Sequence, residues 1–376
     1  MKSIINIVAL ASTAQAILVA PPTGPFAVSM SVTPLTDESR LDPYAPANAT
    51  HARRILISTF LPVNETETPC RNNKTDPYMT PLVAEAYDQL GVAIGLPNGT
   101  FSSFELDFCV ARTSPCRAPS ATYPLVIFSP GWGNPRLLYG AMARELASHG
   151  FAVVTVDHPY DASYVEFPDG EVYAAANIDT DDMAAIGKLT QVRAEDASFL
   201  LTHLLDTPTP GINTSAPLIM GHSLGGATAA SAMLTDPRFV AGMNLDGLLP
   251  EPVLSAGVSG PFALVGRPGH EDEDTTWTTF FAALRGPKAQ LAVNGTVHAS
   301  FTDFPTLIKT LDLELPADAA ALLQSQIGTL AFGRASEVVA GILGDFADLV
   351  LRGGDGGVFG SGDAALPEVT VERAAI

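Results

Sequence analysis

The segment GHSLG, residues 221–225, constrains the fold more than any other part of this sequence. The apolar run 216–220 before it is typical of a buried strand, and the small-residue run 226–233 after it is typical of a helix, with no gap between them. Glycines flank the serine because larger side chains would collide where a strand turns so sharply into a helix. The pattern predicts a nucleophilic serine, Ser223, raised above the edge of a sheet.

The segments around this turn alternate between strand-like and helix-like patterns. Apolar runs such as 124–131 and 151–158 are typical of strands buried on both faces. Segments with apolar residues at helical spacing, such as 138–149 and 181–205, follow them. This alternation predicts a mostly parallel sheet flanked by helices on both faces. Together with the serine turn it predicts the α/β-hydrolase fold.

Residues 17–352 are expected to form one domain. Strand-like segments at 54–63 and 104–110 predict an antiparallel start to the sheet. The long excursion 159–180, which follows a buried strand, is interpreted as part of the pocket wall. The Gly- and Asp-rich residues 353–376 are expected to be a loosely ordered tail without a chemical role.

The first residues predict export. Met1-Lys2, an apolar stretch at 4–10 and the small residues around Gln15 match a signal peptide that covers residues 1–16 and is cleaved after Ala16. We therefore expect a secreted, extracellular protein. Six Asn-X-Ser/Thr sequons support export and predict a glycosylated surface: Asn48, Asn64, Asn73, Asn98, Asn213 and Asn294.

The charge balance excludes some partners. The chain carries 20 Lys and Arg against 40 Asp and Glu, a formal net charge of −20. Nucleic acids and anionic membrane surfaces would repel such a chain, so we expect neither as its main partner.

Three cysteines are present, and an oxidising compartment favours pairing two of them. We expect a disulfide between Cys70 and Cys109, because Cys109 ends a strand-like segment and would anchor the loop after Cys70. Cys116 is then left over. The alternative is that all three are buried thiols.

A serine hydroxyl needs a base within hydrogen-bond reach, and in this fold the histidine follows the serine in the chain. Only His270 and His298 lie after Ser223. His298 follows the strand-like run 289–295, whose carboxyl end would deliver it to the active face. His270 lies among four acidic residues, which is typical of a solvated loop. We therefore predict His298 as the general base.

The base needs a carboxylate that fixes its tautomer and orientation. Asp246 ends the strand-like segment after the serine helix, the position where this fold places the acid. Asp236 comes earlier, at a predicted helix end, and Asp303 is too close in sequence to His298 to be aimed at it. We predict Asp246 as the acid; its structural alternative is a turn-forming aspartate.

Acyl transfer also needs two donors aimed at the developing oxyanion. The fold takes one from the residue after the nucleophile and one from the loop after an early central strand. These are the backbone amides of Leu224 and Trp132. No metal-binding motif and no phosphate-binding glycine pattern is present, so we expect neither a metal nor a cofactor. Asp157 and His158 are interpreted as loop-anchoring or pocket-lining residues.

A predicted helix at 275–284 places Trp277, Phe280, Phe281 and Leu284 on one stripe. We expect this stripe to pack against the sheet. The alternative is an exposed face that contacts lipid surfaces transiently.

Four segments, in this order, resemble the plasma-type platelet-activating factor acetylhydrolases and their secreted fungal relatives: FSPGWGNPRLLYGAMARELASHGF, GHSLGGAT, AGMNLDG and GTVHASFTDF. The resemblance covers residues 54–313 and implies the same triad and oxyanion positions. It also implies calcium-independent hydrolysis of a short or oxidised sn-2 acyl chain of a phospholipid through an acyl-serine intermediate. Pro130 replaces a histidine that the family often has, and the segment after Leu313 shows little likeness; both differences bear on substrate choice.

The residues alone predict only ester hydrolysis by a serine enzyme, and the resemblance implies a small lipid or ester as the substrate. A general carboxylesterase or a cutinase-like polyester hydrolase would share the whole triad. A non-catalytic binding module of the same fold is the alternative from another class, but such modules usually lose a triad member.

Overall fold

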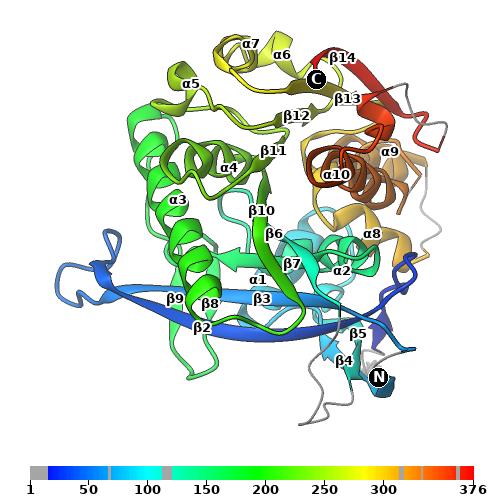
Figure 1. The fold of residues 1–376 in the computed structure, drawn as a ribbon. Helices are drawn as coiled ribbons and strands as arrows, with labels where there is room; N and C mark the ends of the chain where they lie inside the picture. Colours follow the sequence, from blue (N-terminus) through cyan, green and yellow to red (C-terminus); the bar gives the residue numbers. More distant parts are fainter. Residues whose placement is uncertain (1–15, 67–68, 112–120, 313–316, 332, 361–364) are drawn as a thin grey trace, which may run out of the picture.

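The fold is built on a nine-stranded sheet (Figure 1). It is described in a computed structural model that covers residues 16–66, 69–111, 121–312, 317–331, 333–360 and 365–376. The predicted signal peptide, apart from Ala16, lies outside these residues, as does Cys116. From one edge to the other the strands are ordered β14 (Val369–Ala375), β13 (Lys288–Val293), β12 (Phe262–Gly266), β11 (Ala241–Leu245), β10 (Ile212–His222), β6 (Tyr123–Ser129), β7 (Ala152–Asp157), β3 (Ala52–Val63) and β2 (Ala27–Leu41).

The six central strands, β13 to β7, are parallel. Their carboxyl ends therefore meet at one edge of the sheet, where this class of fold places its ligands. Their central residues are buried, which explains the continuous apolar runs in the sequence. The predicted parallel sheet is confirmed.

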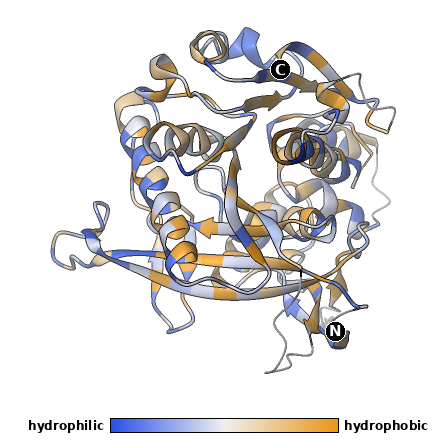
Figure 2. Cartoon of the chain, viewed as in Figure 1, coloured by the Kyte–Doolittle hydropathy of each residue, from blue (hydrophilic) through white to orange (hydrophobic). Residues whose placement is uncertain are grey.

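Helices cover both faces of the sheet (Figure 1). One face carries α3 (Met183–Asp206), α4 (Leu224–Thr235), α5 (Val253–Ala256) and α7 (Thr276–Ala283), whereas α2 (Gly140–Ser148), α8 (Phe304–Thr310), α9 (Ala317–Ile327) and α10 (Arg334–Arg352) pack on the other. Figure 2 shows helices with both hydrophobic and hydrophilic segments, as one buried face requires. The stripe on α7 packs inward as predicted, with Trp277 and Phe280 buried.

The N-terminal strands differ from expectation in one respect. Segment 54–63 lies in β3 and pairs antiparallel with β7 and with the long β2. Segment 104–110 lies instead in β5 (Phe104–Ala111) of a separate three-stranded sheet, with β1 (Ile17–Leu18) and β4 (Cys70–Pro77). That prediction was wrong because an apolar strand pattern does not say which sheet the strand joins. Between β4 and β5 in the chain lies α1 (Pro81–Ala93).

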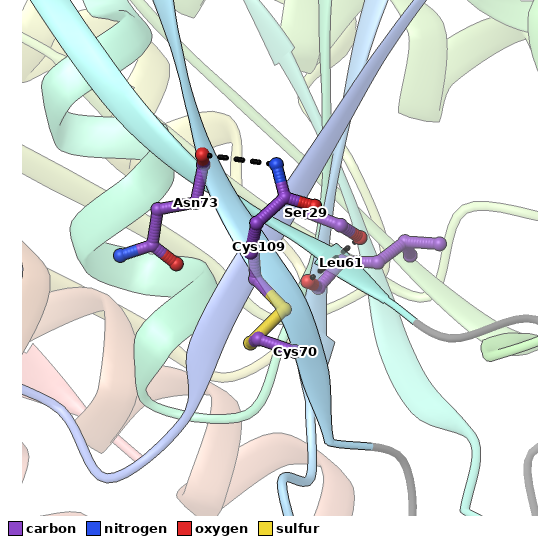
Figure 3. The surroundings of a disulfide bond; sticks show 6 residues. Ser29, Leu61, Cys70, Asn73 and Cys109 are labelled. Carbon is purple, nitrogen blue, oxygen red and sulfur yellow. Dashed lines mark hydrogen bonds between the residues drawn. A yellow bond between two sulfur atoms is a disulfide. The ribbon is translucent and has the colours of Figure 1, made fainter.

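The predicted disulfide is present in the small sheet. Cys70 and Cys109 are bonded to each other, and their strands β4 and β5 pair antiparallel (Figure 3). The bond therefore ties the start of β4 to the strand that leads back toward the main sheet.

The tail prediction was also wrong. Residues 369–375 form β14, which pairs antiparallel with β13 along the outer edge of the main sheet. The Gly- and Asp-rich composition ends before this segment, and VTVERAA offers the backbone hydrogen bonds that the edge of β13 needs. Half-exposed edge strands carry polar residues, so a search for continuous apolar runs does not detect them.

The excursion after β7 contains a short hairpin, β8 (Tyr164–Glu166) and β9 (Val172–Ala174), before α3 begins. Its rings pack on the start of β3: Tyr173 lies 5.1 Å from His51 and 5.2 Å from Tyr160, between ring centroids. Among the described residues, no helix is both long enough and apolar enough to cross a membrane.

Candidate active site

Ser223 lies in a strained turn between β10 and α4. Its φ is +54°, a conformation that costs a non-glycine residue about 1–3 kcal/mol. The turn needs glycines as predicted, because a Cβ on Gly225 would lie 1.9 Å from the carbonyl oxygen of Ser129, and one on Gly221 would lie 2.4 Å from Gly225. The Ser223 side of the turn remains partly exposed to solvent. A strained, accessible serine at the carboxyl edge of the sheet fits a nucleophile.

The two predicted partners are joined to each other. Nδ1 of His298 lies 2.7 Å from Oδ2 of Asp246. A carboxylate accepts, so Nδ1 carries the hydrogen and Nε2 of His298 has its lone pair available for a proton. Asp246 is buried after β11, the neighbour of β10, and His298 is half exposed after β13. The His298 ring lies 4.5 Å from the ring of His222, the residue before Ser223.

Asp246 has a second histidine partner that the sequence did not indicate. His270 was expected in a solvated loop, but it is buried against Trp277, with ring centroids 4.0 Å apart. Its Nδ1 lies 2.8 Å from Oδ1 of Asp246. Arg267 adds its backbone N–H to Oδ1 at 3.0 Å and its Nη1 to Oδ2 at 2.8 Å. The expectation for His270 was wrong because the local acidic sequence does not reveal this fold-back over Asp246.

These donors keep Asp246 ionised. Burial alone would raise the pKa of its carboxyl, but hydrogen bonds from His270 and His298 outweigh burial and hold the pKa well below its usual range. Asp246 therefore presents a negative charge to His298 at neutral pH.

The two predicted oxyanion donors are available. Leu224 begins α4, and Trp132 follows β6 in the loop 130–134. Among the described residues, the backbone amides of both have no hydrogen-bond acceptor. The first amides of a helix lack partners within it and attract negative charge. The indole of Trp132 itself is 43% exposed.

His222, the residue before Ser223 in the serine turn, links the two sides of the site. Its Nε2 lies 3.0 Å from the carbonyl oxygen of His298, so Nε2 carries the hydrogen. Its Nδ1 then accepts from the hydroxyl of Tyr139 at 2.8 Å. That hydroxyl in turn accepts from the N–H of Gly131 at 3.0 Å. Burial, with His298 alongside, lowers the pKa of His222 to about 3, so the bridge stays neutral.

A second Ser-His-Asp set lies nearby and is closed to solvent. Ser129 lies 3.1 Å from Nε2 of His158, whose Nδ1 lies 2.8 Å from Asp196. Ser129 and Asp196 are fully buried, and Arg53 also binds Asp196. Asp157 binds Arg136. The anchoring role predicted for Asp157 and His158 is confirmed.

The rejected acids lie where they cannot serve His298. Asp236 caps the end of α4 and pairs with Arg238. Asp303 accepts from the hydroxyl of Tyr78 at 2.8 Å and from two amides at the start of α2. Burial raises the pKa of Asp303 to about 7.

The sequon asparagines are all at least partly exposed to solvent, and four of them are more exposed than the other two: Asn48, Asn73, Asn98 and Asn294. Their glycosylation stays a prediction. In the part of the chain that the structure describes, no group of three His, Cys, Asp or Glu side chains is placed to hold a metal ion.

Residues 96–177 and 185–315 match the family model described as platelet-activating factor acetylhydrolase, isoform II. The matched residues make up more than half of the chain and include Trp132, Ser223, Asp246 and His298. The chain belongs to this family.

Relatives of the family extend the likeness. The chain is 28% identical to a probable 1-alkyl-2-acetylglycerophosphocholine esterase of Arthroderma benhamiae, over 95% of this chain and 94% of that protein. It is 30% identical to the platelet-activating factor acetylhydrolase of Cavia porcellus, over 48% of this chain and 49% of that enzyme, so this match spans about half of each.

A solved structure confirms the α/β-hydrolase fold. A ferulic acid esterase from Streptomyces cinnamoneus superposes with a TM-score of 0.76 at 29% identity, covering 95% of this chain and 99% of that one. The family, the relatives and this neighbour are all esterases. This acetylhydrolase-family chain is therefore an ester hydrolase and not a non-catalytic binding module.

Proposed function

We propose that the protein is a secreted serine esterase that removes short or oxidised acyl chains from the sn-2 position of phospholipids. The observation that carries the serine mechanism is the 2.7 Å contact of His298 with Asp246, at the edge of the sheet where β10 ends and Ser223 follows it. The substrate class is supported by the names of the relatives, which act on platelet-activating factor and on 1-alkyl-2-acetylglycerophosphocholine.

The contacts of the site support the following mechanism. Oγ of Ser223 attacks the ester carbonyl carbon and Nε2 of His298 takes the hydroxyl proton. The carbonyl oxygen becomes an oxyanion between the two backbone amides described above. When the intermediate collapses, the bond to the leaving oxygen breaks, and His298 gives its proton to that oxygen, releasing the alcohol. Water, deprotonated by His298, then hydrolyses the acyl-Ser223 ester.

A fluorophosphonate probe tests the nucleophile. The purified protein should become labelled at Ser223, and the Ser223→Ala variant should not. Labelling that persists in Ser223→Ala would falsify this assignment. Ester turnover should be insensitive to EDTA, and loss of activity on chelation would contradict the metal-free mechanism.

Acyl-chain profiling tests the substrate. On one phosphocholine headgroup, an sn-2 acetyl chain should be hydrolysed at least about 100-fold faster than a palmitoyl chain, the scale on which a pocket discriminates by several methylenes. The second candidate is a general carboxylesterase, which the likeness to a ferulic acid esterase favours. Faster turnover of ethyl ferulate, or of a polyester, than of the acetyl phospholipid would select that alternative.

A further inference from the structure

The loop that carries Trp132 is held by a buried ion pair. Arg193, from the middle of α3, is 1% exposed and forms a two-contact pair with Asp161, with Nε at 2.7 Å from Oδ2 and Nη2 bound to Oδ1. Its Nη1 also lies 2.6 Å from the carbonyl oxygen of Pro130, and Nη2 lies 3.3 Å from that of Gly131. The guanidinium therefore binds two successive backbone carbonyls just before Trp132.

The amides of the same loop are occupied on either side of Trp132. The N–H of Gly131 donates to the hydroxyl of Tyr139 at 3.0 Å. The N–H of Gly133 donates to Oδ1 of Asp161 at 3.2 Å, and that of Asn134 donates to Gly131. Among the described residues of this loop, the amide left without an acceptor is the one assigned to the oxyanion.

Peptide planarity connects these two observations. The carbonyl of Gly131 and the N–H of Trp132 belong to one trans peptide unit, so they point in opposite directions. The two donors that hold this carbonyl, Nη2 of Arg193 and the N–H of Asn134, therefore also set the direction of the N–H. If the carbonyl were released, this peptide could rotate and present an oxygen in place of the amide, which would repel an oxyanion.

We propose that Arg193, held by Asp161, is a positioning residue that fixes the peptide between Gly131 and Trp132 so that the Trp132 amide faces the oxyanion. The inference rests on the proposed role of Ser223. Arginine suits this task because its fork serves one carboxylate and two carbonyls at once. Lysine would keep the charge but would not fill all of these contacts.

Two substitutions and a matched control test the proposal. Arg193→Lys keeps the positive charge beside Asp161, and Arg193→Met removes it. Arg144→Met is the control, because Arg144 is equally buried and paired, with Asp107, but lies on α2 without a contact to the loop. Folded active sites are counted in every variant by fluorophosphonate labelling carried to completion.

Turnover of 4-nitrophenyl acetate per labelled site is then measured. Both Arg193 variants should lose about 10²–10³ in kcat, the usual effect of losing one oxyanion donor, with KM changed by less than about 3-fold. Arg144→Met should lose thermal stability without losing kcat per site. If Arg193→Met does not fold, Arg193→Lys alone decides.

A trifluoromethyl ketone separates positioning from general damage, because it forms an oxyanion on Ser223 whereas the matched methyl ketone does not. Its affinity should fall in Arg193→Lys by the same factor as kcat, while that of the methyl ketone stays unchanged. Unchanged kcat per site, or an equal loss for both ketones, overturns the proposal. A wild type that no fluorophosphonate labels instead refutes the serine mechanism, so the two failures are distinguishable.

Discussion

Nδ1 of His270 lies 2.8 Å from Oδ1 of Asp246, the carboxylate oxygen that His298 does not use. Asp246 is thus shared between two imidazoles, one buried and one half exposed. The half-exposed ring lies 4.5 Å from the ring of His222, next to Ser223 in the chain, whereas the buried ring contacts Trp277 and Asp274. The buried histidine therefore holds one oxygen of the carboxylate, and under the proposed mechanism the exposed histidine exchanges protons with substrate.

Replacing the two histidines should have unequal effects. We expect His298→Ala to lower ester turnover by several orders of magnitude, since the general base is lost. His270→Ala should cost about 10-fold, because a hydrogen bond to a charged group contributes about 1.5–3 kcal/mol and Arg267 still holds the carboxylate. Steady-state kcat/KM of both variants checks this. The reverse order of severity would make His270 the base.

Asp303 should make the stability of the protein depend on pH. Its folded pKa is raised to about 7, from 3.8, so the native state binds more protons than the unfolded state between these values. The free energy of unfolding should therefore fall as pH rises from 4 to 7, by as much as about 4 kcal/mol from this group. Urea denaturation of wild type and Asp303→Asn at both pH values measures the difference. Asp236→Asn is the control, since the pKa of Asp236 is lowered, chiefly by Arg238 acting against burial. A slope that Asp303→Asn leaves unchanged contradicts the prediction.

The disulfide should stabilise the protein without affecting turnover. Its cysteines are 39 residues apart, and closing a loop of that length in the unfolded chain contributes about 4 kcal/mol. The variant with both Cys70→Ser and Cys109→Ser should lose stability on that scale but keep its kcat at low temperature, because β4 and β5 lie outside the main sheet. A large fall in kcat for the folded variant would show that the small sheet shapes the active site.

Trp132 should matter for lipid surfaces more than for chemistry. Its amide is a backbone group, whereas its indole is 43% exposed beside the site. Trp132→Ala should therefore leave kcat on 4-nitrophenyl acetate within about 3-fold and raise KM on phospholipid vesicles about 10-fold, since indole rings favour membrane interfaces. The KM of Trp132→Phe on vesicles should lie between those of the wild type and Trp132→Ala. Equal losses on both substrates would place the indole in the chemistry.

The parts that were predictable from sequence depend on local patterns. The serine turn is defined by two glycines and by the strand and helix that adjoin it, and Asp246 and His298 each follow an apolar run. A parallel sheet brings such positions together, so the pairing of Asp246 with His298 follows from chain order and topology.

The parts that were missed depend on contacts between distant segments. His270 is buried because its segment folds back over Asp246 and Trp277 covers it, whereas the acidic residues next to it in the sequence suggest exposure to solvent. Arg193 and Asp161 lie 32 residues apart, on an otherwise ordinary helix and in an irregular loop, and no spacing predicts their contact. Asp303 accepts from the amide of Ala141 at the start of α2, although the two residues are 162 positions apart in the chain. Segment 104–110 looks like any other strand, and only its partners place it in the small sheet.

The position of β14 also bears on folding during synthesis. β13 leads into His298, and its outer side hydrogen-bonds to β14. Until residues 369–375 have left the ribosome, β13 is an unpaired strand that can associate with other chains. A nonsense mutation just before codon 369 would spare Ser223, Asp246 and His298. It would nevertheless leave the strand that carries the base without its neighbour, so we expect such a product to aggregate even though its chemistry is complete.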